Sequence, residues 1–260
     1  YKRQILLISL QMSAQQAQGS SGEIIAVKTN NYSSSELVFK DDQSNYLIVG
    51  LPYVYKTETK NISNIYVDIQ YKNFGESRIT IKDLSKVDLS KKDRDRANSE
   101  AVLLRKAIEN FDTSISPSFN FKNPVEGIIS SRYGKQRFIN EKPRSPHLAL
   151  DIAASKGSAI SAPLKGKIIL TGDFFYTGYT IVINHGYGLI SSYSHLDSIS
   201  VMNNQVVQQG DLLGAVGETG RVTGPHLHWT VYLNKERINP EMLLKDNYLK
   251  NLFEAAQDIL

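Results

Sequence analysis

Cysteine is absent from the 260-residue chain. This absence excludes disulfide bonds, thiol catalysis and thiolate-bound metals, so any metal site must use histidine and carboxylate side chains. Apart from a short run near the N-terminus, no apolar stretch approaches the roughly 20 residues that a membrane helix needs, so we expect no stable membrane span. The excess of basic over acidic residues is small, 30 against 26. Since no nucleic-acid-binding motif accompanies it, we expect no nucleic-acid partner.

Length and composition predict a folded protein of one large or two modest domains, and we take two as the starting interpretation. Hydrophobic residues make up 41% of the chain and charged residues 22%, which are ordinary values for a globular protein. A chain of this length exceeds the usual size of a single domain.

The N-terminal 20 residues resemble a secretory leader. Lys2 and Arg3 precede the apolar residues 5–10, and the small and polar residues 13–18 follow, as at the end of a bacterial signal peptide. We therefore expect a signal-like leader over residues 1–20 and a periplasmic or secreted location. A short strand of the fold is the alternative interpretation of this segment.

The part of the chain that follows is predicted to be a small antiparallel β domain, residues 21–90. Residues 64–71 show the pattern best, because Ile65, Val67 and Ile69 alternate with polar residues at the period of two that is typical of a half-buried strand. The expected strands are residues 23–28, 36–40, 46–51, 64–71 and 77–82. No catalytic constellation occurs here, so a supporting or binding role is expected.

Helical and then β patterns fill the rest of the chain, so the expected fold class is mainly β. Apolar residues at intervals of three and four over residues 93–111 predict an amphipathic helix inside a linker, residues 91–120. Short β runs separated by many glycines then predict a compact β domain over residues 121–245. Asn239-Pro240 is typical of a helix start. It predicts a helix through about Leu260, and residues 246–260 are expected to be its C-terminal part.

All five histidines lie in the predicted C-terminal β domain, at positions 147, 185, 195, 226 and 228. On an extended chain, residues two apart share a face, so His226 and His228 point the same way. Their spacing of roughly 6.5 to 7 Å along the strand would let one bind a metal while the other faces substrate. The same logic places His147 and Asp151 on one face, with Leu148 and Leu150 on the other.

Two histidines and one aspartate match the three protein ligands of a catalytic zinc site. Zinc lowers the pKa of a bound water and polarises a carbonyl, which is what amide hydrolysis needs at neutral pH. The remaining His195 and His226 would lie close to that water. One could take its proton and the other could stabilise the oxyanion, and the sequence leaves open which does which.

Several motifs in one order resemble the lysostaphin-type zinc endopeptidases of the bacterial cell wall. They are H-x-x-x-D at 147–151, Y-x-H-L at 193–196 and T-G-P-H-L-H-W at 223–229. Further matches are S-R-Y-G at 131–134, A-P at 162–163, H-G at 185–186, the glycines between 210 and 220, and N-P at 239–240. The resemblance covers about residues 124–245.

This resemblance implies zinc ligands at His147, Asp151 and His228, catalytic histidines at His195 and His226, and an antiparallel β fold with a groove. It also implies a structural role for His185. The family usually has glycine where this chain has Ala149. We expect the methyl group of Ala149 to narrow the groove.

The resemblance further implies a zinc endopeptidase that acts on peptidoglycan peptide stems, at a D-alanyl-to-diaminopimelate cross-link in preference to a glycine bridge. A catalytically silent regulator of cell-wall amidases and a peptidase of extracellular proteins are the alternatives. We also expect the N-terminal domain to restrict access to the groove, with a plain folding or docking module as the alternative.

Overall fold

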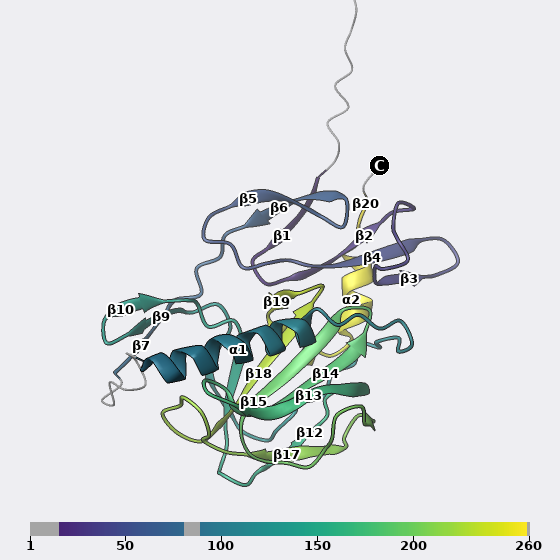
Figure 1. Ribbon diagram of the computed structural model, residues 1–260. Helices are drawn as coiled ribbons and strands as arrows, with labels where there is room; N and C mark the ends of the chain where they lie inside the picture. The colour runs from purple at the N-terminus through teal and green to yellow at the C-terminus, as the bar shows by residue number, and fades with distance from the viewer. Residues whose placement is uncertain (1–15, 81–88, 259–260) are drawn as a thin grey trace, which may run out of the picture.

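The computed structural model describes residues 16–80 and 89–258. These residues form a mainly β protein with an N-terminal sandwich, one long helix and a large antiparallel sheet (Figure 1). Within the described ranges, no helix is long and apolar enough to cross a membrane. Most of the leader predicted over residues 1–20 lies outside the described residues. Its last part is strand β1, where Ala17 is fully buried, so the alternative interpretation holds for those residues.

The N-terminal sandwich consists of two small sheets. One has the order β1-β6-β5 and the other has the order β20-β2-β4-β3. Their strands are β1 (Ala17–Ser20), β2 (Ile24–Lys28), β3 (Val38–Lys40), β4 (Asn45–Gly50), β5 (Glu58–Ile62), β6 (Ile65–Gln70) and β20 (Gln257–Asp258). Ile65, Val67 and Ile69 of β6 are buried, as their alternation predicts. The pairings β1–β6 and β2–β20 are parallel, so the sandwich is mixed, and the end of the chain supplies one of its strands.

Strands β2 and β4 are buried on both faces. Val27 and Leu47 point into the sandwich, where they pack with other apolar residues of the two small sheets. Ile24 and Ile48 point the other way and join the main core of the large sheet. Because both faces of these strands bury apolar side chains, their sequences are almost continuously apolar. The sandwich and the large sheet therefore share a core.

Strand β7 (Glu76–Ile79) leaves the sandwich and pairs with a hairpin from the second half of the chain. It runs parallel to β9 (Gln136–Ile139), which pairs with β10 (Lys142–Arg144). The strand expected at residues 77–82 is thus present over its first part, and residues 81–88 lie outside the described range. Its pairing partner could not be read from local sequence.

The large sheet has the order β16-β13-β14-β15-β18-β11-β8, with β12, β17 and β19 paired off this path. Its strands are β8 (Ile128–Ser131), β11 (Leu150–Ala153), β12 (Ala159–Ser161), β13 (Gly166–Phe174), β14 (Gly178–Gly186), β15 (Leu189–Ile199), β16 (Val206–Val207), β17 (Leu212–Val216), β18 (His226–Leu233) and β19 (Glu236–Ile238). One face packs on the main core, where Tyr193 and Trp229 are fully buried. The mainly β fold and the antiparallel C-terminal domain are confirmed.

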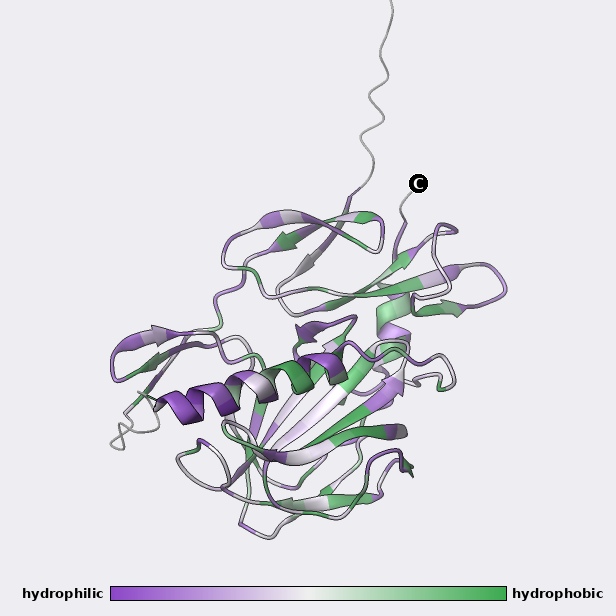
Figure 2. Ribbon diagram, viewed as in Figure 1, coloured by the Kyte–Doolittle hydropathy of each residue, from purple (hydrophilic) through white to green (hydrophobic). Residues whose placement is uncertain are grey.

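Helix α1 (Lys91–Ile108) lies across the opposite face of this sheet (Figure 1). Ser90 caps its start by accepting a hydrogen bond from the backbone N–H of Asp93. Its first turns are hydrophilic, and apolar residues are concentrated in its second half (Figure 2). There Leu104, Ala107 and Ile108 pack on a small cluster that includes Val182 and Tyr232. The predicted helix is confirmed, and its apolar side covers part of the sheet.

The C-terminal segment differs from the single helix predicted between Asn239 and Leu260. Asn239 does cap a helix start, but a 3₁₀ helix (Pro240–Leu244) ends where Lys245 becomes extended. Asn247 takes a left-handed conformation, and helix α2 (Tyr248–Glu254) follows. The expectation of continuous helix is wrong, because the buried Tyr248 and Leu252 hold α2 against the core and the chain then turns into β20.

Candidate metal centre and active-site groove

The three predicted ligands converge beside the paired strands β11 and β18. The carboxylate oxygen Oδ1 of Asp151 lies 3.0 Å from Nε2 of His147 and 2.7 Å from Nδ1 of His228. The two ring nitrogens are 3.4 Å apart. Ligands about 2.0 to 2.1 Å from a tetrahedral zinc ion stand roughly 3.3 Å from one another. The donor types and their spacing therefore fit a zinc ion.

Strand pairing brings Asp151 and His228 together. They are directly opposed in the antiparallel register of β11 and β18, and the next same-face pair along the strands is Ala153 and His226. His226 and His228 share one face of β18, while Leu227 and Trp229 on the other face are fully buried. The alternation predicted for this segment is confirmed.

His147 reaches the site from outside the strand. The segment was expected to be extended from His147 to Asp151, but β11 begins only at Leu150. Backbone hydrogen bonds hold His147 instead: its N–H donates to Lys135, and its carbonyl accepts from Gly134. Its Nδ1 lies 3.1 Å from the carbonyl oxygen of Arg132, which can only accept. The proton therefore sits on Nδ1, and Nε2 offers a lone pair to a metal.

The face assignment around Ala149 was wrong. Ala149 is 1% exposed and lines neither of the two cavities beside the site, whereas Leu148 lines the larger one. The reason is that residues 147–149 precede the strand, so the two-residue alternation does not apply to them. The methyl group of Ala149 is packed inside and does not narrow the groove.

His195 faces the site because of a local irregularity in β15. Tyr193 points into the core and Ser194 lines the groove, so regular alternation would send His195 to the core. Instead His195 has a left-handed backbone conformation with φ 68°, and the strand register shifts at the neighbouring Leu196. Such irregularities re-aim side chains beside active sites.

The rings of His195 and His226 stand next to the three ligands. Their centroids are 5.0 Å apart, and His195 is 5.6 Å from the ring of His228. Nε2 of His226 lies 3.9 Å from Oδ1 of Asp151. A second group of three donors, His195, His226 and His228, also has its ligand atoms within 4.8 Å of one another, and it shares His228 with the first group.

Backbone carbonyls orient both of these additional histidines. Nδ1 of His195 lies 2.9 Å from the carbonyl oxygen of Thr219, and Nδ1 of His226 lies 2.9 Å from that of Gly224. Because a carbonyl only accepts, each neutral ring carries its proton on Nδ1 and leaves Nε2 as a proton acceptor. Both rings are thus prepared to take a proton at Nε2 and then to donate it.

The surroundings of the site determine the protonation states of Asp151 and His195. Burial acts to raise the pKa of Asp151, but the nearby His228 and the close contacts of the carboxylate with His147 and His228 outweigh burial and hold the pKa well below its usual range. Burial first, and then the charges of His228 and His226, lower the pKa of His195 to about 3. At neutral pH the site therefore combines an ionised carboxylate with a neutral His195.

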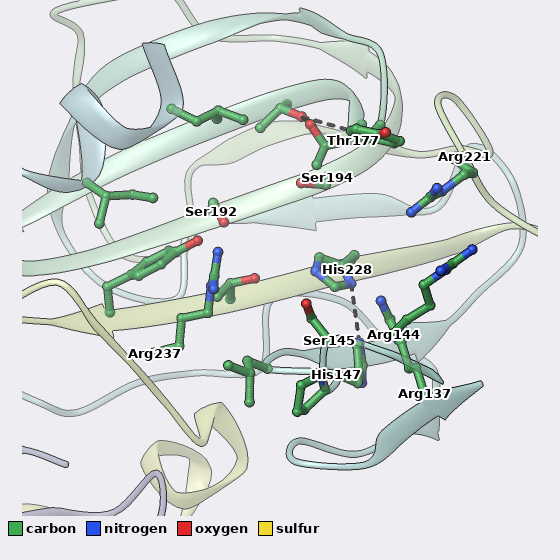
Figure 3. Close-up of a pocket in the computed structure, with 18 of the residues that line it drawn as sticks. Arg137, Arg144, Ser145, His147, Thr177, Ser192, Ser194, Arg221, His228 and Arg237 are labelled. Atoms are coloured by element: carbon green, nitrogen blue, oxygen red, sulfur yellow. Dashed lines mark hydrogen bonds between the residues drawn. The ribbon is translucent and has the colours of Figure 1, made fainter. Parts of the chain in front are cut away.

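The groove extends along the sheet face as a cavity of about 530 Å³ (Figure 3). Leu104 and Ile108 of α1 line it together with His147 and His228. In Figure 3, Arg137, Arg144 and Arg221 gather at the end near His228, and Arg237 lies at the other end beside Ser192. A second cavity of about 280 Å³ lies beside Asp151 and His226.

Other parts of the site were not anticipated from sequence. The groove arginines were missed because no local pattern marks them: Arg137 and Arg144 come from the β9–β10 hairpin, Arg221 from the loop after β17 and Arg237 from β19. Thr219 was missed because it acts through its main-chain carbonyl. Ser131 and Arg132, which contact Nδ1 of His147, do fall within the S-R-Y-G motif.

His185 lies apart from the histidine cluster. It is fully buried, with Nδ1 2.8 Å from the carbonyl oxygen of Lys165 and Nε2 2.7 Å from the hydroxyl of Ser191. Burial lowers its pKa to about 4. Both ring nitrogens are satisfied by the core, which agrees with the expected structural role.

Comparisons with known proteins agree with this geometry. A family model described as peptidase family M23 matches residues 145–240. The peptidoglycan DD-endopeptidase ShyA of Vibrio cholerae is 35% identical over 112 residues, which span 43% of this chain and 26% of that protein. The murein hydrolase activator NlpD of Escherichia coli is 29% identical over 126 residues, which span 48% of this chain and 31% of that protein. The alignments thus span less than a third of each relative.

A solved structure extends the similarity beyond the groove domain. A Pseudomonas aeruginosa protein, described as an M23 peptidase candidate, superposes with a TM-score of 0.68 and 29% identity over 86% of this chain and 94% of that chain. This coverage includes most of the N-terminal half. The histidine motifs, the groove and these comparisons together show that residues 145–240 are similar to peptidase family M23.

Proposed function

We propose that this chain is a zinc-dependent endopeptidase that hydrolyses peptide cross-links of bacterial peptidoglycan, at the bond between D-alanine and diaminopimelate. The observation that carries this proposal is the convergence of His147, Asp151 and His228 within 2.7 to 3.4 Å, with two further histidines beside them. The similarity to a peptidoglycan DD-endopeptidase supports the choice of substrate. An extracytoplasmic location, periplasmic or secreted, follows from such a substrate.

In this proposal His147, Asp151 and His228 hold the zinc ion. A zinc ion at this position would supply Lewis acidity to a water molecule and to the scissile carbonyl. His195 and His226 surround the reacting atoms. One takes a proton at Nε2, and the other, once protonated there, donates a hydrogen bond to the oxyanion or passes the proton to the leaving amine. Because His195 and His226 have the same tautomer, either histidine could fill either role.

The groove walls exclude water and position the substrate. The sheet face beside His228 offers the hydroxyls of Ser192, Ser194 and Thr230, which can hydrogen-bond an extended peptide. The apolar residues Leu104 and Ile108 of α1 form one wall. This combination suits a peptide stem that carries small side chains and an exposed main chain.

We propose that residues 21–90 and 91–120 act as a supporting domain and a linker for the peptidase domain, residues 121–245, and that β1 and β20 from the two ends of the chain complete the supporting domain. Two observations support a restricting role for the segments before residue 120. Helix α1 lines the larger cavity, and Ser77 and Ile79 of β7 line the smaller one. A change in the position of either element would alter access to the groove.

A catalytically silent regulator of amidases is the second candidate, favoured by the similarity to the activator NlpD. The experiment that separates the two is digestion of purified sacculi with the zinc-loaded protein, followed by analysis of the released muropeptides. Loss of cross-linked dimers without released free stem peptides supports the endopeptidase. An unchanged muropeptide profile, combined with faster digestion by an added amidase, would support the regulator instead.

A further inference from the structure

Three guanidinium groups gather at one end of the groove. Arg137 and Arg144 are directly opposed partners on the β9–β10 hairpin, so their side chains leave neighbouring positions on the same face. Arg221 comes from the loop after β17 and lines the same cavity (Figure 3). Like charges that are directly opposed on paired strands destabilise a sheet. The opposed Arg137 and Arg144 therefore have a cost in the free energy of folding, which a bound anion would offset.

The electrostatic consequences of this clustering are visible in the pKa values of the arginines. Burial and the nearby Arg221 lower the pKa of Arg137, although Asp151 opposes them. Burial and the charge of Arg144 also lower the pKa of Arg221, although Tyr176 acts to raise it. The three groups thus interact with one another across the groove.

Arg137 and Arg144 have no carboxylate partner among the described residues. Within residues 16–80 and 89–258, no carboxylate lies within ion-pair distance of Arg137 or Arg144. Three arginines elsewhere on the surface are paired with carboxylates: Arg78 with Glu76 and Glu141, Arg96 with Glu100, and Arg132 with Glu241. Asp151, the nearest acidic group to Arg137, is already engaged by His147 and His228.

Arg137 also stands between the two cavities. It lines the larger cavity together with His147 and His228, and the smaller cavity together with Asp151 and His226. An anion held by Arg137 would therefore lie next to the candidate metal centre. Guanidinium groups bind carboxylates in a planar, bidentate geometry, and they remain charged at all physiological pH values.

The proposed cross-link places a carboxylate close to the bond that is cut. In a D-alanyl-to-diaminopimelate bond, the amide nitrogen is attached to a carbon that itself carries a free carboxylate. A bond to a lysine side chain has a methylene group at that position, and a bond inside a glycine bridge has no free carboxylate there. A site for this carboxylate would distinguish the three kinds of cross-link.

We propose that Arg137 and Arg144, together with Arg221 across the groove, bind the free carboxylate on the amine side of the scissile bond and so determine specificity for diaminopimelate cross-links. This inference rests on the proposed peptidase function and adds its specificity determinant. The arginines touch the substrate away from the reacting atoms, so they act on binding and orientation.

The test compares two soluble cross-linked dimers that differ in one group, the free carboxylate next to the scissile nitrogen and its carboxamide. We expect kcat/KM of the wild-type protein to be roughly 10- to 100-fold higher for the carboxylate, as for loss of a charge-assisted hydrogen bond. Arg144→Gln and Arg137→Gln should reduce this ratio towards one, mainly by raising KM, with unchanged zinc content. Arg105→Gln, which removes an exposed charge outside the groove, is the matched control.

A binding measurement without metal makes the test independent of catalysis. The metal-free wild-type protein is titrated by calorimetry with a diaminopimelate tripeptide and with its amidated form. Tighter binding of the carboxylate form, lost in Arg144→Gln, supports the anion site even if a variant of the partly buried Arg137 folds poorly. Equal binding of the two peptides, or equal cleavage of both dimers by the wild-type protein, would overturn the anion site while leaving the peptidase function intact. Failure to cleave either dimer would instead overturn the peptidase function, and the calorimetry alone would then decide the anion site.

Discussion

Asp151 and His228 face each other across the β11–β18 pair, with Oδ1 2.7 Å from Nδ1. Strand register alone produces this contact, because the two residues occupy directly opposed positions. A one-residue shift in register would send one of the two side chains into the core. Two of the three candidate ligands are therefore fixed by the same hydrogen bonds that hold the large sheet together.

Replacing the shared carboxylate should abolish tight metal binding. Asp151→Asn removes the negative charge that both His147 and His228 contact, so we expect zinc affinity to fall by at least about 100-fold. The measurement is zinc affinity by competition with a chromophoric chelator. Zinc should also raise the melting temperature of the wild-type protein but not that of the variant. Asp173→Asn, an exposed carboxylate near α1, is the control, and equal zinc affinity of both variants would contradict the assignment.

Thr219 is expected to act as a positioning residue for His195. Its hydroxyl donates to the carbonyl of Leu196 and accepts from the N–H of Tyr179, while its own carbonyl accepts from His195. Thr219→Val removes the hydroxyl but keeps the shape, so we expect kcat to fall by about tenfold, with KM and zinc content unchanged. Thr219→Ser should restore most of the activity. If Val and Ser variants lose the same activity, the hydroxyl has no positioning role.

The hydrogen bonds of Glu100 should control how firmly α1 covers the groove. Its Oε2 accepts from the backbone N–H of Phe175, and its Oε1 pairs with Arg96. We expect Glu100→Ala to loosen α1 and to speed digestion of intact sacculi by at most about tenfold, the effect of roughly 1.4 kcal/mol. Cleavage of small soluble dimers should change less.

Glu109→Ala, an exposed residue at the C-cap of α1, is the control. Equal or slower digestion of sacculi by Glu100→Ala would indicate a plain structural role for the helix.

The buried His185 should make stability depend on pH. Its pKa in the folded protein is about 4, below the ordinary value of 6.5, so the unfolded chain binds more protons between these values. The stabilisation is therefore complete above pH 6.5 and is lost as the pH falls towards 4, by about 3 kcal/mol in total. Denaturant unfolding of the metal-free protein should show this loss, and it should be smaller in His185→Gln. An identical pH dependence of both proteins would contradict this account of His185.

The sequence predicted those parts of the fold and site that depend on local periodicity. The alternation of His226 and His228 with Leu227 and Trp229 is set by β18 itself, so a local pattern could reveal it. The position of His195 depends on a left-handed residue in β15, which alternation does not anticipate.

Long-range pairing accounts for most of the remaining differences. Strand β7 pairs with β9, and β20 pairs with β2, across large sequence separations that no local pattern encodes. Arg137 and Arg144 become partners only when the hairpin closes. The C-terminal helix was overestimated because the burial of Tyr248 and Leu252, which decides its course, is a tertiary effect.

Zinc content measured side by side in His226→Ala and His228→Ala tests the central claim most directly, because the two overlapping donor groups differ in their need for His226. The account predicts that His226→Ala retains about one zinc ion per chain but loses cross-link cleavage by roughly 10²- to 10⁴-fold. It predicts that His228→Ala loses both zinc and cleavage. Loss of zinc from His226→Ala, or undiminished cleavage by that variant, would contradict it.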